Sequence, residues 1–207
     1  MEALLDLYHE PYDPRRPTVC FDELPYQLVA ETRQPLPPRP GLPACIDYEY
    51  RRGGTANVFL CCQPQAGWRH VTVTERRTKQ DFAEQMRELV DVHYPAATII
   101  RVVLDNLNTH TGGALYEAFA PAEARRLLRK LEFHYTPKHG SWLNQAEIEL
   151  SILSGQCLDR RIGDRETLAQ QVAAWEQERN EAQSLIHWRF TTTEARDRLT
   201  RVYPAAS

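Results

Sequence analysis

The 207-residue sequence has no long apolar run, and a membrane-spanning helix needs about 18 consecutive apolar residues. We therefore expect no contact with a membrane. The first residues, MEALLDLYHE, carry acids where a signal peptide carries bases, so no secretory leader is expected. The five cysteines show no CxxC spacing, which argues against a zinc site built from them. Their mostly apolar surroundings favour reduced thiols in a cytoplasmic protein.

An excess of positive charge is also lacking, because the formal net charge is −3. Bulk charge therefore does not favour nucleic-acid binding, although a local basic face would. The basic residues are bunched, and paired bases can bind phosphates. The bunched groups are Arg76, Arg77 and Lys79; Arg125, Arg126, Arg129 and Lys130; and Arg160 and Arg161. We expect these groups to contact DNA weakly and with little sequence preference.

Short apolar runs alternate with helical periodicities along the chain. We predict strands near residues 17–23, 56–64, 68–75, 98–105 and 131–136, the second and third forming an antiparallel hairpin. We predict helices at 2–9, at 79–92, at 112–130 with a break at Pro121, at 142–157, and from Asp164 to about 183. This order indicates an α/β fold with a mixed sheet flanked by helices. We assign residues 17–185 to one domain, 1–16 to a linker or stub, and 186–207 to a tail with a weak helix and a loose end.

Two of the predicted strands end in a carboxylate, Asp22 in PTVCFDE and Asp105 in TIIRVVLDN. A buried carboxylate is unfavourable unless it is paired, hydrogen-bonded or holding a metal. Open α/β sheets build their sites just beyond the strand ends. A third acid could come from the helix in SWLNQAEIELS, where Glu147 and Glu149 point roughly 200° apart. Only one of them can face a given site, and periodicity does not choose between them or exclude two ordinary solvent-exposed acids.

The stretch DNLNTH, with Asn106 directly after the acid and His110 five positions after it, resembles the second-aspartate motif of mariner-like and related bacterial insertion-sequence transposases. The stretch TPKHGSWLNQAE is similar to the block that precedes the third acid of that family. Aligned on Leu143-Asn144, the third acid falls on Glu147. The family's first aspartate matches Asp22 in CFDE.

The interval between Asp105 and the third acid is longer than is usual in that family, which indicates an insertion around Pro121. Glu149 therefore stays as the alternative third acid.

This resemblance implies an RNase H-like fold in which Asp22, Asp105 and Glu147 converge and bind two divalent metal ions. Mg²⁺ is expected, with Mn²⁺ as a substitute, because hard cations prefer carboxylate oxygens. Two such ions serve the attacking and the leaving oxygen of a phosphodiester. The implied activity is metal-dependent cleavage and strand transfer of DNA at insertion-sequence ends.

Other residues of the two motifs are candidates for supporting roles. Asn106 could orient Asp105, touch a phosphate, or only complete a turn at the strand end. His110 could lie near the reacting phosphate or be structural. Lys138 could contact a phosphate or be solvated. Asn144 and Glu149 complete the candidate set.

Members of that family usually carry helix-turn-helix domains ahead of the catalytic domain, whereas 16 residues precede the first predicted strand here. Either the binding half is a separate helix-turn-helix polypeptide, or this chain is a trimmed or decayed form. The expected partners are DNA (transposon ends and target), in the first case a separate helix-turn-helix polypeptide, and a second copy of the chain in a homodimeric active complex. The expected location is cytoplasmic, with the nucleoid when active. Two alternatives remain: a stand-alone RNase H-like nuclease that hydrolyses without strand transfer, and an inactive relic that only folds, dimerises or binds DNA.

Overall fold

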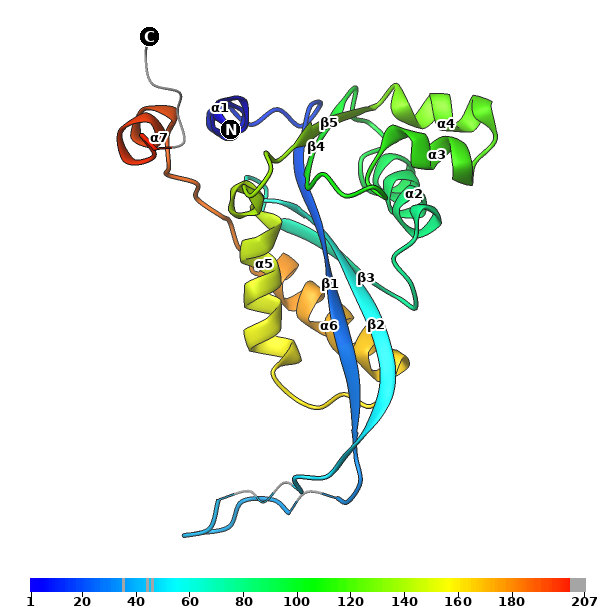
Figure 1. Ribbon diagram of the computed structural model, residues 1–207, viewed down its shortest axis with the longest axis vertical. Helices are drawn as coiled ribbons and strands as arrows, with labels where there is room; N and C mark the ends of the chain where they lie inside the picture. Colours follow the sequence, from blue (N-terminus) through cyan, green and yellow to red (C-terminus); the bar gives the residue numbers. More distant parts are fainter. Residues whose placement is uncertain (35, 44, 46, 202–207) are drawn as a thin grey trace.

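A mixed five-stranded sheet forms the centre of the molecule (Figure 1). The computed structural model describes residues 1–34, 36–43, 45 and 47–201. The strands are β1 (Thr18–Glu31), β2 (Tyr50–Gln63), β3 (Trp68–Thr74), β4 (Ile100–Leu104) and β5 (Leu131–Tyr135). They lie in the order β3-β2-β1-β4-β5, with β1, β2 and β3 antiparallel and with β4 parallel to both β1 and β5. The predicted α/β fold with an RNase H-like mixed sheet is therefore confirmed.

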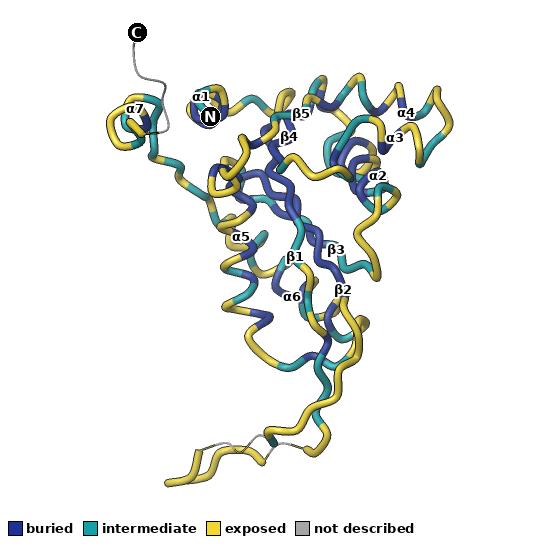
Figure 2. Tube along the Cα trace, viewed as in Figure 1, coloured by how far each residue is buried: buried dark blue, intermediate teal, exposed yellow. Residues whose placement is uncertain are grey.

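Helices cover both faces of this sheet. They are α1 (Glu2–His9), α2 (Lys79–Glu88), α3 (Gly112–Ala118), α4 (Pro121–Leu128), α5 (Ala146–Leu153), α6 (Arg165–Glu181) and α7 (Thr192–Arg198), with a 3₁₀ turn η2 (Ser141–Leu143) and two π turns, η1 (Leu89–His93) and η3 (Ser154–Leu158). Buried residues of α1, α5, α6 and α7 share one core, and those of α2, α3 and α4 share the other. Figure 2 shows β4 and the adjoining parts of β1 and β2 as buried, whereas the projecting parts of β1 and β2 are more exposed. Alternating residues of β1 enter opposite cores, Cys20 the first and Phe21 the second.

Most of the predicted elements are present at the expected places. The break at Pro121 separates α3 from α4, and the side chain of Asp164 caps α6 by accepting from the Thr167 N–H. Thr78 and Asp81 form a reciprocal capping box at the start of α2. The hairpin of β2 and β3 is antiparallel, as predicted.

The first two strands are much longer than predicted. β1 continues from Asp22 to Glu31, and β2 begins at Tyr50, so that residues 24–31 pair with residues 50–58. This part forms a hairpin that projects from the body of the molecule (Figure 1). The β2 segment YRRGGT is exposed on both faces and has no apolar alternation, which is why its pattern did not predict a strand.

The two terminal segments pack against each other and on the sheet. Leu4, Leu5 and Leu7 of α1 are buried in the first core, and Ala195 of α7 is buried with them. Thr192 Oγ1 donates a hydrogen bond to Asp6 at 2.6 Å. Residues of the segments assigned to a linker and a tail thus contribute to the core. The predicted loose end, residues 202–207, lies outside the described residues.

Candidate active site

The parallel pairing of β1 with β4 brings the two predicted aspartates to one level. Thr18 is paired with Arg101 and Cys20 with Val103. Continued by two residues, this register sets Asp22 level with Asp105, where β4 has ended. The prediction that Asp22 ends its strand is wrong, because β1 continues beyond it by pairing with β2. The site therefore lies beside a continuous strand, just beyond the end of its parallel neighbour.

Asp22 is a buried carboxylate with two hydrogen-bond donors. The Glu23 N–H donates to Oδ1 at 2.8 Å, and Asn144 Nδ2 donates to Oδ2 at 3.2 Å. Burial raises the pKa of Asp22 to about 7, and the charges of Glu147, Glu23 and Asp105 add to this, although the Glu23 N–H opposes it. Negative charges from three elements therefore act on one buried oxygen pair.

Asn144 fixes the start of the helix that carries the third acid. Its fully buried amide donates from Nδ2 to the Phe21 carbonyl at 2.8 Å, and its Oδ1 accepts from the Ala146 N–H at 3.2 Å. The helix predicted over 142–157 is accordingly interrupted here, with η2 before Asn144 and α5 after it. Glu147 lies exposed in the first turn of α5, and its charge acts on Asp22.

Glu149 has different surroundings. Its side chain is fully buried, and its Oε1 accepts from Arg69 Nη2 at 3.2 Å and from Arg179 Nη2 at 2.8 Å. Because two guanidinium groups already neutralise this carboxylate inside the core, the alternative assignment of the third acid to Glu149 is not supported. Of the two glutamates, Glu147 is the one whose charge acts on Asp22.

Asp105 is held by a buried histidine. His110 Nδ1 donates to Asp105 Oδ1 at 2.5 Å, and His110 Nε2 lies 3.1 Å from Glu23 Oε2. Burial of the ring lowers its pKa, but the Asp105 hydrogen bond and the Glu23 carboxylate outweigh burial and raise the pKa of His110 to about 9. A charged imidazolium thus bridges the two acids and packs against Phe21 and Phe82.

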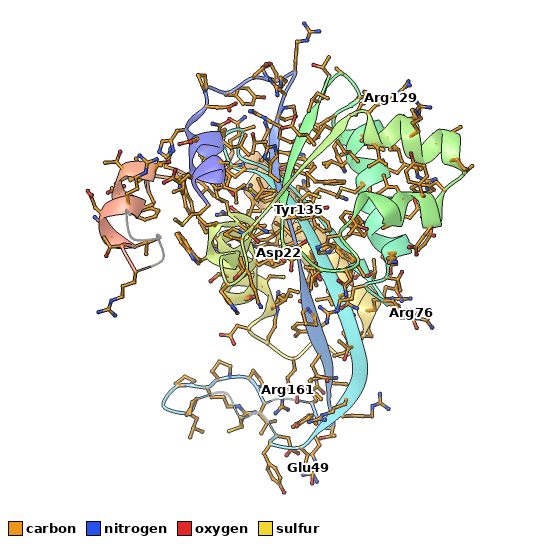
Figure 3. The ribbon with its side chains drawn as sticks, turned by 45° about the horizontal axis from the view of Figure 1, so that its top comes forward. Asp22, Glu49, Arg76, Arg129, Tyr135 and Arg161 are labelled. Atoms are coloured by element: carbon orange, nitrogen blue, oxygen red, sulfur yellow. The ribbon has the colours of Figure 1, made fainter. Side chains whose placement is uncertain are left out.

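The loops after β4 and β5 form an open hollow of about 430 Å³ beside Asp105. It is lined by Asp105, Asn106, Leu107, Thr136, Pro137, Lys138, His139 and Ser141. His139 has a φ of 63°, a conformation that costs free energy for a residue other than glycine and that is often found at functional sites. The hollow places Asn106 and Lys138 beside Asp105. Figure 3 labels Asp22 and Tyr135 near the centre of its view.

The three carboxylates form a donor set that fits divalent metal ions. Oxygen donors from β1, the end of β4 and α5 would all be ligands for hard cations, and a bound cation would favour the ionised form of Asp22 that burial disfavours. Within the described part of the chain, the three do not place their oxygens within 4.8 Å of one another.

A comparison with family profiles gives the family of the chain. The profile of the DDE superfamily endonuclease family matches residues 17–169. The chain belongs to this family. No curated protein sequence matches the DDE chain.

Two solved structures are similar to this DDE endonuclease domain. The Mos1 strand transfer complex is 16% identical with a TM-score of 0.44, and the match covers 90% of this chain and 60% of that one. The Mos1 transposase paired-end complex with the left transposon end is 14% identical with a TM-score of 0.34, covering 88% and 60%. The DDE chain therefore spans about 60% of the length of the Mos1 chains it resembles.

Sequence reasoning missed two residues that contact His110 at the candidate site. Glu23 directly follows Asp22 in the sequence, but its contact with His110 lies on the opposite face of β1. Tyr135 ends β5 and donates from its hydroxyl to the His110 carbonyl at 2.8 Å. Period-two alternation along β1 would have placed Glu23 on the Phe21 face, whereas nothing local predicts the Tyr135 contact.

Most of the basic residues predicted to contact DNA are engaged within the DDE chain. Lys79 pairs with Glu117, Arg126 with Asp91 and Glu123, Arg77 with Glu23, and Arg161 with Glu31, while Lys130 and Arg160 donate to the carbonyls of Pro95 and Cys157. Among the described residues, Arg76, Arg125 and Arg129 form no ion pair within 4.0 Å. No described helix combines the length and hydropathy needed to cross a bilayer.

Proposed function

We propose that this chain is the catalytic domain of a bacterial insertion-sequence transposase of the mariner-like type. It would cleave DNA at the element ends and join it to a target. The observation that carries the proposal is the common level of Asp22 and Asp105, together with the Asn144 hydrogen bonds that attach the Glu147 helix to the same point of β1.

Asp22, Asp105 and Glu147 would hold two divalent ions, Mg²⁺ or Mn²⁺. Bound ions would supply activation of the attacking oxygen and neutralisation of the leaving oxygen. Asp22, the most buried of the three and central in the sheet, would contact both ions, and each of the others would contact one.

The remaining residues would position these acids and the DNA. His110 holds the Asp105 carboxylate by a hydrogen bond, so Asp105 keeps one orientation. Asn144 does the same for Asp22. Lys138 and Asn106 lie in the hollow beside Asp105, where a phosphate of the bound strand would meet an ammonium and an amide.

DNA contact by the isolated chain should be weak, because six of the nine basic residues expected to contact DNA are engaged by groups of the chain itself. Arg76, Arg125 and Arg129 are the strongest candidates for phosphate contacts, and the paired bases would have to exchange a carboxylate for a phosphate. Selective binding to element ends would come from a helix-turn-helix partner, and strand transfer from a homodimer.

A strand-transfer reaction with DNA that carries the element ends, supplied with a helix-turn-helix partner protein, tests this proposal. Mg²⁺-dependent products joined to target DNA are expected. Hydrolysed ends without joining would indicate a stand-alone nuclease, and intact DNA with wild-type protein would indicate an inactive relic. Either result would contradict the proposal.

A further inference from the structure

A second group of metal-ligand side chains lies at the other edge of the sheet, on and beside β3. It consists of His70 on β3, Glu88 at the end of α2, and His93 at the end of η1. One ligand atom from each residue lies within 4.8 Å of the other two, and within the described ranges this is the one group of three that does so. The proposed DNA chemistry does not use these residues.

The spacing of the ligand atoms is close to that around a tetrahedral ion. His70 Nε2 lies 3.4 Å from Glu88 Oε1, and His93 Nε2 lies 3.7 Å from the same oxygen. Zinc bonds of about 2.0–2.1 Å in tetrahedral geometry separate the ligand atoms by about 3.3 Å. Small side-chain rotations would therefore bring all three atoms onto one ion.

The local backbone explains why Glu88 and His93 point the same way. In an α-helix, residues five apart project roughly 140° apart. Here α2 is followed by the π turn η1, whose Tyr94 N–H donates to the Leu89 carbonyl, and a π turn is widened to i→i+5 bonds. Such turns are rare and frequently occur at functional sites. This π turn brings the Glu88 carboxylate and the His93 imidazole to the same side of the helix, the side that faces β3.

The ligating nitrogen of His93 has no other use. His93 Nε2 is buried and has no hydrogen-bond partner among the described residues. Buried polar nitrogens are normally hydrogen-bonded, so an orphan needs an explanation. A metal ion would satisfy this lone pair.

His70 has the outer partner that is typical of a metal-bound histidine. Its Nδ1 lies 3.1 Å from Glu176 Oε1 on α6, and the other Glu176 oxygen accepts from the Val71 N–H at 2.7 Å. A carboxylate on Nδ1 fixes the tautomer that presents Nε2 to a metal. The Thr72 hydroxyl, 3.2 Å from Nε2, can rotate away.

We propose that His70, Glu88 and His93 form a site for Zn²⁺, with water as the fourth ligand. Two imidazoles and one carboxylate favour Zn²⁺ over Mg²⁺. The Glu88 side chain is 38% exposed, which gives the ion a path of entry. A bound ion would tie α2 and η1 to β3 and, through Glu176, to α6, so it would join the helices of both faces around the sheet edge.

Calorimetric titration of the full chain with Zn²⁺, after treatment with a chelator, tests the site. We expect one Zn²⁺ to bind per chain at micromolar or lower free metal. Millimolar Mg²⁺ should not displace this ion, and Asp22→Asn should bind Zn²⁺ as the wild type does. His93→Gln should weaken binding at least 100-fold, because it removes a ligand whose nitrogen makes no hydrogen bond. His134→Gln should bind as the wild type does, because His134 pairs with Glu132 on β5, away from the cluster.

Co²⁺ in place of Zn²⁺ gives a second readout. We expect the intense visible absorption of a four-coordinate site, lost in His93→Gln and in Glu88→Gln, with circular dichroism confirming that each variant is folded. If one of these variants does not fold, the other still removes a ligand. Absence of Zn²⁺ binding to the wild type, or equal binding by the wild type and a folded ligand variant, would overturn the site and leave His70 as an ion-paired side chain.

Discussion

At the residue scale, Asp22 is a buried carboxylate whose ionised form is disfavoured both by burial and by the negative charges of its neighbours. It is 9% exposed, and burial raises its pKa to about 7. Because the pKa in the folded state lies above the ordinary value of about 3.8–3.9, the group favours folding when it is protonated and disfavours it as pH rises through 7. Such a cost is expected if Asp22 holds a metal ion, as proposed above.

Asp22→Asn should therefore stabilise the protein in chelator increasingly as pH rises. Asn cannot ionise, so the difference in unfolding free energy between variant and wild type should shift in favour of the variant by on the order of 2 kcal/mol between pH 5 and pH 8. Comparing the two pH values cancels any constant loss at the Asn144 contact. Denaturant unfolding of both proteins at pH 5 and pH 8 measures this change. If the difference in unfolding free energy is independent of pH, the pKa of Asp22 is not raised in the folded protein.

His110 should show the opposite dependence. Its pKa, raised to about 9, exceeds the ordinary value of about 6.5, so its stabilising effect is complete below pH 6.5 and is lost as pH rises through 9. His110→Gln should cost on the order of 2 kcal/mol at pH 6 and much less at pH 10. Urea denaturation at the two pH values tests this. An equal loss at both would mean that the ring acts only by packing on Phe21 and Phe82.

At the scale of elements, α5 separates a site residue from a core residue within one turn. Glu147 is exposed and acts on Asp22, whereas Glu149 is fully buried between Arg69 and Arg179. The two substitutions Glu147→Gln and Glu149→Gln are therefore matched controls for each other on the same helix.

Glu149→Gln should lower stability by about 3 kcal/mol, because it leaves the buried guanidinium of Arg69 without its counter-charge. In a chain of this size that corresponds to a melting temperature lower by roughly 10 °C. Glu147→Gln should melt in chelator within about 1–2 °C of the wild type, since the side chain is exposed. Scanning calorimetry of the pair checks the assignment. The reverse pattern would identify Glu149 as the site residue.

The sequence predicted the elements better than it predicted their ends. The strand before Asp105 and the break at Pro121 follow from apolar runs and proline chemistry, which act locally. The extension of β1 to Glu31 does not, because it depends on cross-strand hydrogen bonds to an exposed partner. The choice between Glu147 and Glu149 depends on Arg69, a residue distant in sequence whose burial no local pattern predicts. The cluster at His70 also joins three separate segments.

At the scale of the whole molecule, metal binding at the three carboxylates should stabilise the fold. A ligand that binds only the folded state adds RT ln(1 + [L]/Kd) to stability, about 2.7 kcal/mol when the ligand is at 100 times Kd. Millimolar Mn²⁺ or Mg²⁺ should raise the melting temperature of the wild type, and the gain should be much smaller in Asp22→Asn, Asp105→Asn and Glu147→Gln. Thermal melts with and without metal measure this, and His93→Gln, which alters the other cluster, should keep the gain with Mg²⁺. Equal gains with Mg²⁺ in all four variants would place the ion elsewhere.

The convergence of Asp22, Asp105 and Glu147 on bound metal is the central claim, and iron-directed cleavage of the polypeptide tests it most directly. Fe²⁺ in the site, with ascorbate and peroxide, generates radicals that cut the nearest backbone, and mass spectrometry locates the cuts. We predict cuts near residues 22, 105 and 147 together, suppressed by excess Mg²⁺ and absent in Asp22→Asn. Cuts near residues 70, 88 and 93 would report the other cluster and should be suppressed by Zn²⁺. Cleavage that spares the segments around 22, 105 and 147, or that persists there in Asp22→Asn, would contradict the account.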